Sequence, residues 1–230
     1  MLQLKIFALF CGLFAVIAFQ DGVAQADESE PVEECPDDEG DRDGNDTLCD
    51  NFQALRETID KNTLMDLIQS HYQCDSKFRK AMCYYNTTHF QIVAQQLQQS
   101  DGYHLMLEEL RSGGVDTSDI ENIVDIISCV TVPPPLPDKN CDCKQLKGHT
   151  FMGDLLAAMP HQAVHEYTAK SRSRKSNFAL FVDIVNSPEF QSHMRTNMMK
   201  RDVVRPMRVL RRNGWDLPQL LRGVMTILSW

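Results

Sequence analysis

The residues best suited to metal or catalytic chemistry stand at spacings that do not complete a known site. His161 and His165 lie four residues apart, so both could face one metal ion from a single helix. Gln162 stands where zinc peptidases have the glutamate that follows the first histidine, and the sequence places no third ligand nearby. We therefore interpret the pair as two surface histidines at the start of a helix.

Two other segments have a metal-like composition without the required spacing. The Cys141-Asp142-Cys143 segment could hold a soft metal or form a redox pair, but the number of other cysteines favours structural pairing. The acidic run that begins at Asp41 has Asp46 and Phe52 where an EF-hand needs glycine and glutamate. The sequence also contains no nucleophile elbow and no P-loop. It therefore argues against an enzyme and predicts no metal and no cofactor.

Residues 1–26 have the features of a secretory signal peptide. Lys5 precedes an uncharged apolar run over residues 6–19, and Ala24-Gln25-Ala26 provides a small-x-small cleavage site. The apolar run is shorter than the roughly 20 residues that cross a bilayer, and no later segment is uncharged over that length. We expect a secreted, extracellular protein that begins near Asp27, with an uncleaved anchor as the alternative.

Seven cysteines follow the predicted cleavage site, and in an oxidising compartment all are disulfide candidates. The odd number leaves one of them unpaired or joined to a partner. A helix over residues 75–85 would hold Cys74 and Cys83 about 13 Å apart, beyond the ~7 Å limit for a bridge, so each should pair elsewhere. Asn45 and Asn86 begin Asn-x-Thr sequons, which predict glycosylation in loops. The cysteine candidates are Cys35, Cys49, Cys74, Cys83, Cys129, Cys141 and Cys143.

Charge is distributed unevenly along the chain. Residues 27–47 contain eleven acids and one base, and we expect a disordered acidic arm. Residues 48–130 have a net charge of −6 and residues 148–230 a net charge of +6. The arm could lie against the basic second half or remain a solvated tail, and the basic residues could attract an anionic membrane surface. Because no aromatics interleave them, they do not predict nucleic-acid binding. The cluster of basic residues meant here consists of Arg172, Arg174, Lys175, Lys200, Arg201, Arg205, Arg208, Arg211 and Arg212.

The elements that must position any site repeat along the chain. From about residue 50 to residue 230 the sequence matches itself without a gap when shifted by one hundred residues, so that Phe90-Gln91 recurs as Phe190-Gln191. Apolar spacings of three and four predict six short amphipathic helices in residues 48–130 and six in residues 148–230. Residues 131–147 form a connector that contains prolines and cysteines. The sequence predicts an all-α protein whose two repeats form one globular unit.

Turn and capping residues predict where several of these helices begin and end. Gly113-Gly114 and Asn213-Gly214 should end the fifth helix of each repeat. Ser118 and Glu121 should form a capping box at the start of the sixth helix. Pro206 predicts that the fifth helix of the second repeat starts late or is kinked.

Three motifs of the second repeat occur in a known family: the opening over residues 151–160, the Ser-Pro-Glu-Phe helix start at residues 187–190, and the Gly214-Trp215-Asp216 turn. With them, the chain from residue 50 to residue 230 resembles the insect allergen repeat family, which includes cockroach group 1 allergens, mosquito midgut microvillar proteins and butterfly nitrile-specifier proteins. The resemblance implies a capsule of two six-helix repeats around a large apolar cavity that holds fatty acids or phospholipids. It also implies secretion into the insect gut lumen and a digestive or lipid-transport role. The first repeat departs from the pattern, since Asp60 stands where Pro160 does.

A non-specific lipid-binding protein is the function that we expect. Burying a sixteen-carbon chain contributes on the order of 11 kcal/mol at ~0.8 kcal/mol per methylene, so no charged anchor is required. The alternatives are a membrane-active lipid-exchanging protein, a nitrile-specifier-like detoxification factor, and a helical body with a solid core. The candidate lining residues are Leu55, Ile59, Leu67, Phe78, Met82, Phe90, Val93, Leu97, Leu110, Val124, Ile127, Leu155, Met159, Val164, Phe178, Val182, Phe190, Met194, Met198, Leu210, Val224 and Ile227.

Overall fold

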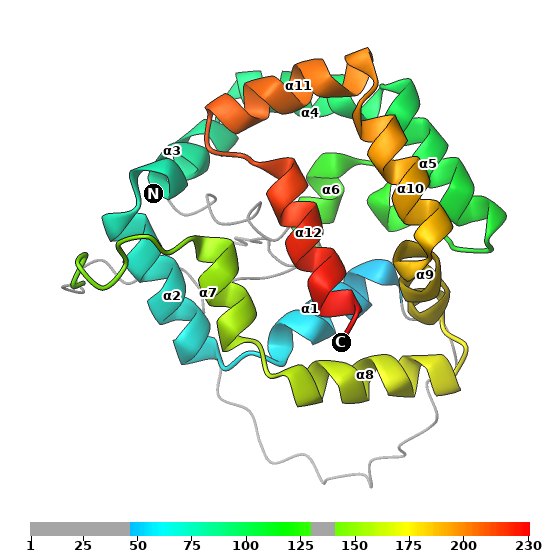
Figure 1. The fold of residues 1–230 in the computed structure, drawn as a ribbon, viewed down its shortest axis with the longest axis horizontal. Coiled ribbons are helices and arrows are strands. Elements are labelled where there is room, and N and C mark those ends of the chain that lie inside the picture. The colour runs from blue at the N-terminus through cyan, green and yellow to red at the C-terminus, as the bar shows by residue number, and fades with distance from the viewer. Residues whose placement is uncertain (1–46, 130–140) are drawn as a thin grey trace, which may run out of the picture.

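The structure is a computed structural model that describes residues 47–129 and 141–230. These residues form α-helices and one 3₁₀ helix and contain no strand, which confirms the all-α prediction (Figure 1). The predicted signal peptide, the acidic arm up to residue 46, Cys35, Asn45 and most of the connector lie outside the described residues. In chain order the elements are α1 (Leu48–Glu57), α2 (Lys61–Cys74), α3 (Ser76–Tyr85), α4 (Thr88–Gln98), α5 (Asp101–Ser112), the 3₁₀ helix η1 (Ser118–Ile120), α6 (Ile123–Ser128), α7 (Phe151–Ala158), α8 (His161–Ser173), α9 (Asn177–Asn186), α10 (Pro188–Met198), α11 (Arg201–Arg212) and α12 (Leu217–Leu228).

Side-chain caps explain where most of the helices begin. Thr47 and Asp50 form a capping box at the start of α1. The Asp75 carboxylate accepts from two amides at the start of α3, and the Ser187 hydroxyl accepts from the Phe190 amide at the start of α10. These contacts satisfy amide groups that have no partner within the helix.

One predicted helix start is wrong, and for the helix that contains Pro206 one of the two predicted alternatives is excluded. The capping box expected at Ser118 and Glu121 does not form, because the Glu121 carboxylate instead accepts from Arg111 at 2.5 Å. The segment folds into η1, and α6 begins later, after an Asn122 cap. α11 does not start late, because Pro206 lies inside a helix that begins at Arg201.

The helices recur at the spacing of the sequence repeat. α2, α4 and α5 begin at residues 61, 88 and 101, and α8, α10 and α11 begin at residues 161, 188 and 201. The turns after α5 and α11 also match: Gly114 and Gly214 have φ angles of 87° and 96°. In each turn the following amide donates back to a leucine carbonyl, Leu110 at 3.1 Å and Leu210 at 3.0 Å.

Helices from the two halves of the sequence pack against one another. α4 lies beside α11, α5 beside α10, and α2 beside α7 (Figure 1). Aromatic rings from both halves meet between them: the ring centroids of Phe78 and Phe151 are 4.8 Å apart, and those of Phe90 and Trp215 are 5.5 Å apart. The buried Trp215 indole also donates to the Ala81 carbonyl at 3.0 Å. The halves therefore share one hydrophobic core.

Two disulfides join the first half of the chain to itself and to the connector. Cys49 in α1 is bonded to Cys129 after α6, and Cys74 at the end of α2 is bonded to Cys143. The prediction that Cys74 and Cys83 do not pair with each other is confirmed. Each bridge closes a long loop and so removes entropy from the unfolded chain, which stabilises the fold by on the order of 4 kcal/mol. The prediction that Cys83 pairs with another cysteine is wrong, because Cys83 is exposed and carries a free thiol.

The turn glycines provide a matched test of this packing. We expect Gly214→Ala to lower the free energy of unfolding by about 3 kcal/mol or more, because its φ is positive and a Cβ would lie 2.6 Å from the Lys77 carbonyl oxygen. Gly114→Ala is the control: it has the same backbone strain but its Cβ would meet only Leu180, at 3.9 Å, so a loss of about 1 kcal/mol is expected. Urea unfolding measures the free energy of unfolding of both variants. Equal losses of stability would show that the turn after α11 does not pack against α3.

Candidate functional site

An apolar cavity of about 200 Å³ lies among the described parts of α4 to α6 and α9 to α12, and it is partly open to solvent. Its wall consists of aliphatic, aromatic and thioether side chains, and among the described lining residues Tyr103 is the one with a polar side-chain oxygen or nitrogen. Five of the lining residues are methionines, whose flexible side chains adapt to irregular ligands. The lining residues are Leu97, Tyr103, Met106, Leu107, Leu110, Ile120, Ile123, Ile126, Phe181, Val185, Phe190, Met194, Met198, Val203, Met207, Leu217, Leu220, Leu221, Val224 and Met225.

Each helix of the wall contributes one face. The lining residues of α5 lie at 103, 106, 107 and 110, and those of α10 lie at 190, 194 and 198. These spacings of three and four place the side chains on one side of each helix. The site is therefore built from the same periodicity that makes the helices amphipathic.

The hydroxyl of Tyr103 gives the cavity no charged anchor. It donates to the Ile120 carbonyl at 2.5 Å, so its hydrogen-bonding capacity is used within the wall. Burial, together with the nearby Glu121 carboxylate, raises the pKa of Tyr103 far above its usual range. The phenol stays neutral at physiological pH, and the wall therefore favours hydrocarbon over polar or ionic ligands.

The structure places the predicted lining residues in two groups. Six of them line the cavity: Leu97, Leu110, Phe190, Met194, Met198 and Val224. The others pack between helices, except that the side chain of Ile127 lies outside the described part of the structure. Those in the core are Leu55, Ile59, Leu67, Phe78, Met82, Phe90, Val93, Val124, Leu155, Met159, Val164, Phe178, Val182, Leu210 and Ile227.

The lining residues that the sequence reasoning missed have a recognisable signal. Tyr103 and Val203 stand one hundred residues apart, as do Leu107 and Met207, and both pairs line the cavity. These positions are apolar in both repeats but differ in residue type. Identical pairs such as Phe78 and Phe178, which the repeat predicts to line the cavity, instead pack against aromatic neighbours across the core.

The main cluster of titratable groups lies outside the cavity and ties α2 to α7. The Asp154 carboxylate is 2.8 Å from Nε2 of His71 and 2.7 Å from Nδ1 of His149. Burial opposes the charged form of Asp154, but the hydrogen bonds to both histidines outweigh it and lower the pKa of the carboxyl group. With a proton on Nε2, His71 donates to a carboxylate that stays ionised.

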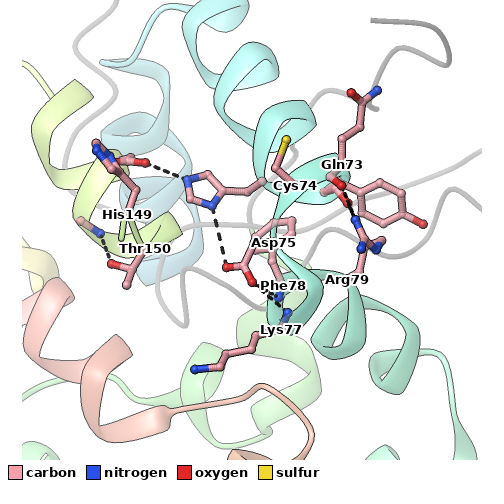
Figure 2. Close-up of polar contacts among 12 residues, drawn as sticks. Gln73, Cys74, Asp75, Lys77, Phe78, Arg79, His149 and Thr150 are labelled. Carbon is pink, nitrogen blue, oxygen red and sulfur yellow. Dashed lines mark hydrogen bonds and ion pairs between the residues drawn. The ribbon is translucent and has the colours of Figure 1, made fainter. Parts of the chain in front are cut away.

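The His71 ring is buried between the two halves. It is 1% exposed and lies 5.9 Å from the Phe78 ring and 5.5 Å from the Phe151 ring. Its Nδ1 has no hydrogen-bond partner and is 4.0 Å from the Asp75 carboxylate, which also accepts from the Lys77 amide (Figure 2). The cluster is suited to holding the two helices together.

The remaining candidates for metal chemistry take part in structural contacts. The His161 ring stacks on Trp230 with centroids 3.6 Å apart, and His165 Nδ1 is 2.9 Å from the Trp230 carbonyl oxygen. Cys143 is in a disulfide. Within residues 47–129 and 141–230 no group of three metal-ligating side chains is placed to hold an ion, and no helix is long and apolar enough to cross a membrane.

Comparison with known proteins gives one match. The sequence profile described as insect allergen related repeat, nitrile-specifier detoxification matches residues 47–221. No curated protein and no solved structure matches the chain. The matched range includes α4 to α6 and α9 to α11 of the cavity wall in full, and residues 217–221 of α12.

The histidine cluster predicts an acid-dependent stability. Because the pKa of Asp154 is lowered in the folded state, its stabilising effect is complete above the ordinary value near 3.9 and is lost as the pH falls below it towards the lowered value. Asp154→Asn should lower the free energy of unfolding by about 1–3 kcal/mol at pH 7 and flatten its fall at acid pH.

Asp183→Asn is the matched control for this measurement. Asp183 pairs with Arg172 at 3.0 Å on the surface, where an ion pair contributes less than about 1 kcal/mol. Urea unfolding at pH 7 and at acid pH compares the two variants. An equal effect of both would contradict a specific role of Asp154 at the α2–α7 junction.

Proposed function

We propose, since the chain belongs to the insect allergen related repeat family, that it is a lipid-binding protein that holds the acyl chain of a fatty acid or phospholipid in the apolar cavity. The observation that carries the proposal is a wall of twenty residues in which the Tyr103 hydroxyl is the single polar side-chain group. The proposed role is binding and not catalysis. It includes secretion and a digestive or lipid-transport function, as in the gut lumen of an insect.

The proposed architecture is a capsule of two six-helix repeats, α1 to α6 and α7 to α12. The matching starts of three helix pairs and the matching glycine turns support this division. The cavity lies off the centre of the capsule, because the rings of Phe78 and Phe90 meet aromatic partners from the second half there. Lipid would therefore occupy the end built from α5, α6 and α10 to α12.

The size of the cavity sets how lipid can enter. A cavity of roughly 150 Å³ is known to hold a benzene molecule, whereas ligand pockets commonly span about 300–1,000 Å³. The cavity of about 200 Å³ has room for a segment of an acyl chain, and a whole chain would require the wall helices to part. When the wall helices part, the lining methionines at positions 106, 194, 198, 207 and 225 can change rotamer at low cost.

No polar group of the wall is available to a lipid headgroup, so the proposed binding is non-specific. Each methylene that leaves water contributes ~0.8 kcal/mol, whichever headgroup it carries. The headgroup would stay at the opening of the cavity, where water solvates it. We expect fatty acids and phospholipids with similar chains to compete for one site.

Two neighbouring methionines test this site. Met198 lines the cavity, whereas Met199 is 79% exposed. Met198→Glu should weaken binding of a fluorescent fatty-acid probe by at least about tenfold, because a carboxylate in an apolar cavity loses its hydration. Met199→Glu introduces the same charge at the same helix end and should change the affinity by less than about twofold. Equal binding by both variants, with melting temperatures that match the wild type, would refute the assignment.

A second candidate function rests on the family description, which names nitrile-specifier detoxification. In that role the protein would steer the breakdown product of a plant toxin instead of carrying lipid. An assay of the products formed from plant glucosinolates, with and without the protein, separates the two candidates. A shift towards nitriles would favour detoxification, and an unchanged product ratio together with probe binding would favour lipid carriage.

A further inference from the structure

α11 has two chemically different faces. Val203 and Met207 point to the cavity, and Leu210 is buried in the core. The opposite side carries an arginine face, which we define as Arg201, Arg205, Arg208 and Arg212, and all four residues are exposed. Their spacings of four, three and four residues keep them within an arc of about 60° along the helix.

The arginine face has no anionic partner in the described structure. None of its four guanidinium groups forms an ion pair with a carboxylate of residues 47–129 or 141–230, whereas the adjacent Arg211 is paired with Asp216 at 3.1 Å. Lys80 of α3 extends the positive surface, since its amine donates to the Arg212 carbonyl at 2.7 Å. Like charges along one helix repel one another, and an external anion would relieve that repulsion.

We propose that the arginine face of α11 docks the protein on the surface of an anionic lipid membrane, and that the cavity exchanges its lipid there. The docking step rests on the charges alone, whereas the exchange step rests on the proposed function. One helix separates the cavity from the docked surface, because Val203 and Met207 on its inner side alternate with Arg205 and Arg208 on its outer side. Parting of α11 from its neighbours would then open the cavity towards the membrane.

Charge complementarity and apolar exposure favour a membrane as the partner. A membrane surface presents many mobile phosphates, which a row of long arginine side chains can contact at several points at once. Met199 is 79% exposed two residues before Arg201 and gives an apolar side chain next to the arginine face. The acidic residues 27–46 are the competing occupant of this face, and the experiment separates the two.

Co-sedimentation with vesicles tests the docking. The purified protein without the predicted signal peptide, residues 27–230, is mixed with vesicles of phosphatidylcholine and with vesicles in which part of the phosphatidylcholine is replaced by phosphatidylserine, at low and at physiological salt. We expect binding to the anionic vesicles only, and weaker binding as salt screens the charges. At about fivefold per arginine, replacing Arg205, Arg208 and Arg212 by Gln should lower the partition coefficient on the order of 100-fold.

The control variant removes the same charge from another helix. Lys170, Arg174 and Lys175, at the end of α8 and just after it, are also exposed, and replacing these three by Gln should change the partition coefficient by less than about fivefold. Equal losses in both triple variants would mean that net charge alone acts, and would overturn the proposal. So would equal binding to neutral vesicles, or binding that requires removal of residues 27–46. Circular dichroism of each variant verifies that the helices are intact.

Titration with a fluorescent fatty-acid probe keeps the docking and the lipid site distinguishable. The arginine variant should bind the probe as the wild type does, because none of its substituted side chains lines the cavity. Vesicle binding without any probe binding by the wild type would refute lipid carriage and leave the docking surface in place. Probe binding without preference for anionic vesicles would refute the docking surface alone.

Discussion

Burial of one apolar face per helix is the constraint on which the rest of this structure depends. The described helices are six to fourteen residues long, and isolated helices of that length are marginal in water. Each therefore needs a partner, and α4, α5 and α2 find theirs in α11, α10 and α7 of the other half. Neither half buries its apolar faces alone. The Cys49–Cys129 disulfide closes the first half, the Cys74–Cys143 disulfide ties it to the connector, and the His71–Asp154 contact joins the two halves around a shared core.

The difference between solid core and cavity follows from side-chain size. Where aromatic rings from both halves face one another, as Phe78 and Phe151 do at 4.8 Å, they fill the space between the helices. Around α5, α6 and α10 to α12 the facing residues are mostly aliphatic or methionine, and they leave about 200 Å³ empty. Dispersion contacts are lost at such a void, so a hydrocarbon ligand that restores them stabilises the protein as it binds. The unfilled space between these side chains thus accounts for the cavity and underlies the proposed binding of apolar ligands.

The sequence was sufficient to predict the helical class, the recurrence of helix positions and the absence of a bridge between Cys74 and Cys83, because caps, periodicity and helical rise act over a few residues. It was not sufficient to predict which apolar residues line the cavity and which pack in the core. Leu110 and Leu210 have the same residue type at equivalent positions, yet Leu110 lines the cavity and Leu210 packs in the core. Periodicity shows which face of a helix turns inward, but the neighbour that fills the space there comes from a distant helix. The predicted capping box at Ser118 does not form for a related reason, because the Glu121 carboxylate accepts a hydrogen bond from Arg111 of α5 instead.

Photo-crosslinking with a diazirine-bearing fatty acid tests the central claim most directly, that hydrocarbon completes the interior between α5, α6 and α10 to α12. The adducts are located by peptide mass spectrometry after irradiation of the purified protein. A lipid site in the cavity predicts saturable labelling, competed by unlabelled fatty acid, on wall peptides that contain Met106, Met194, Met207 or Met225. Labelling confined to exposed positions such as Ile92 or Leu180, or labelling that no competitor reduces, would contradict it.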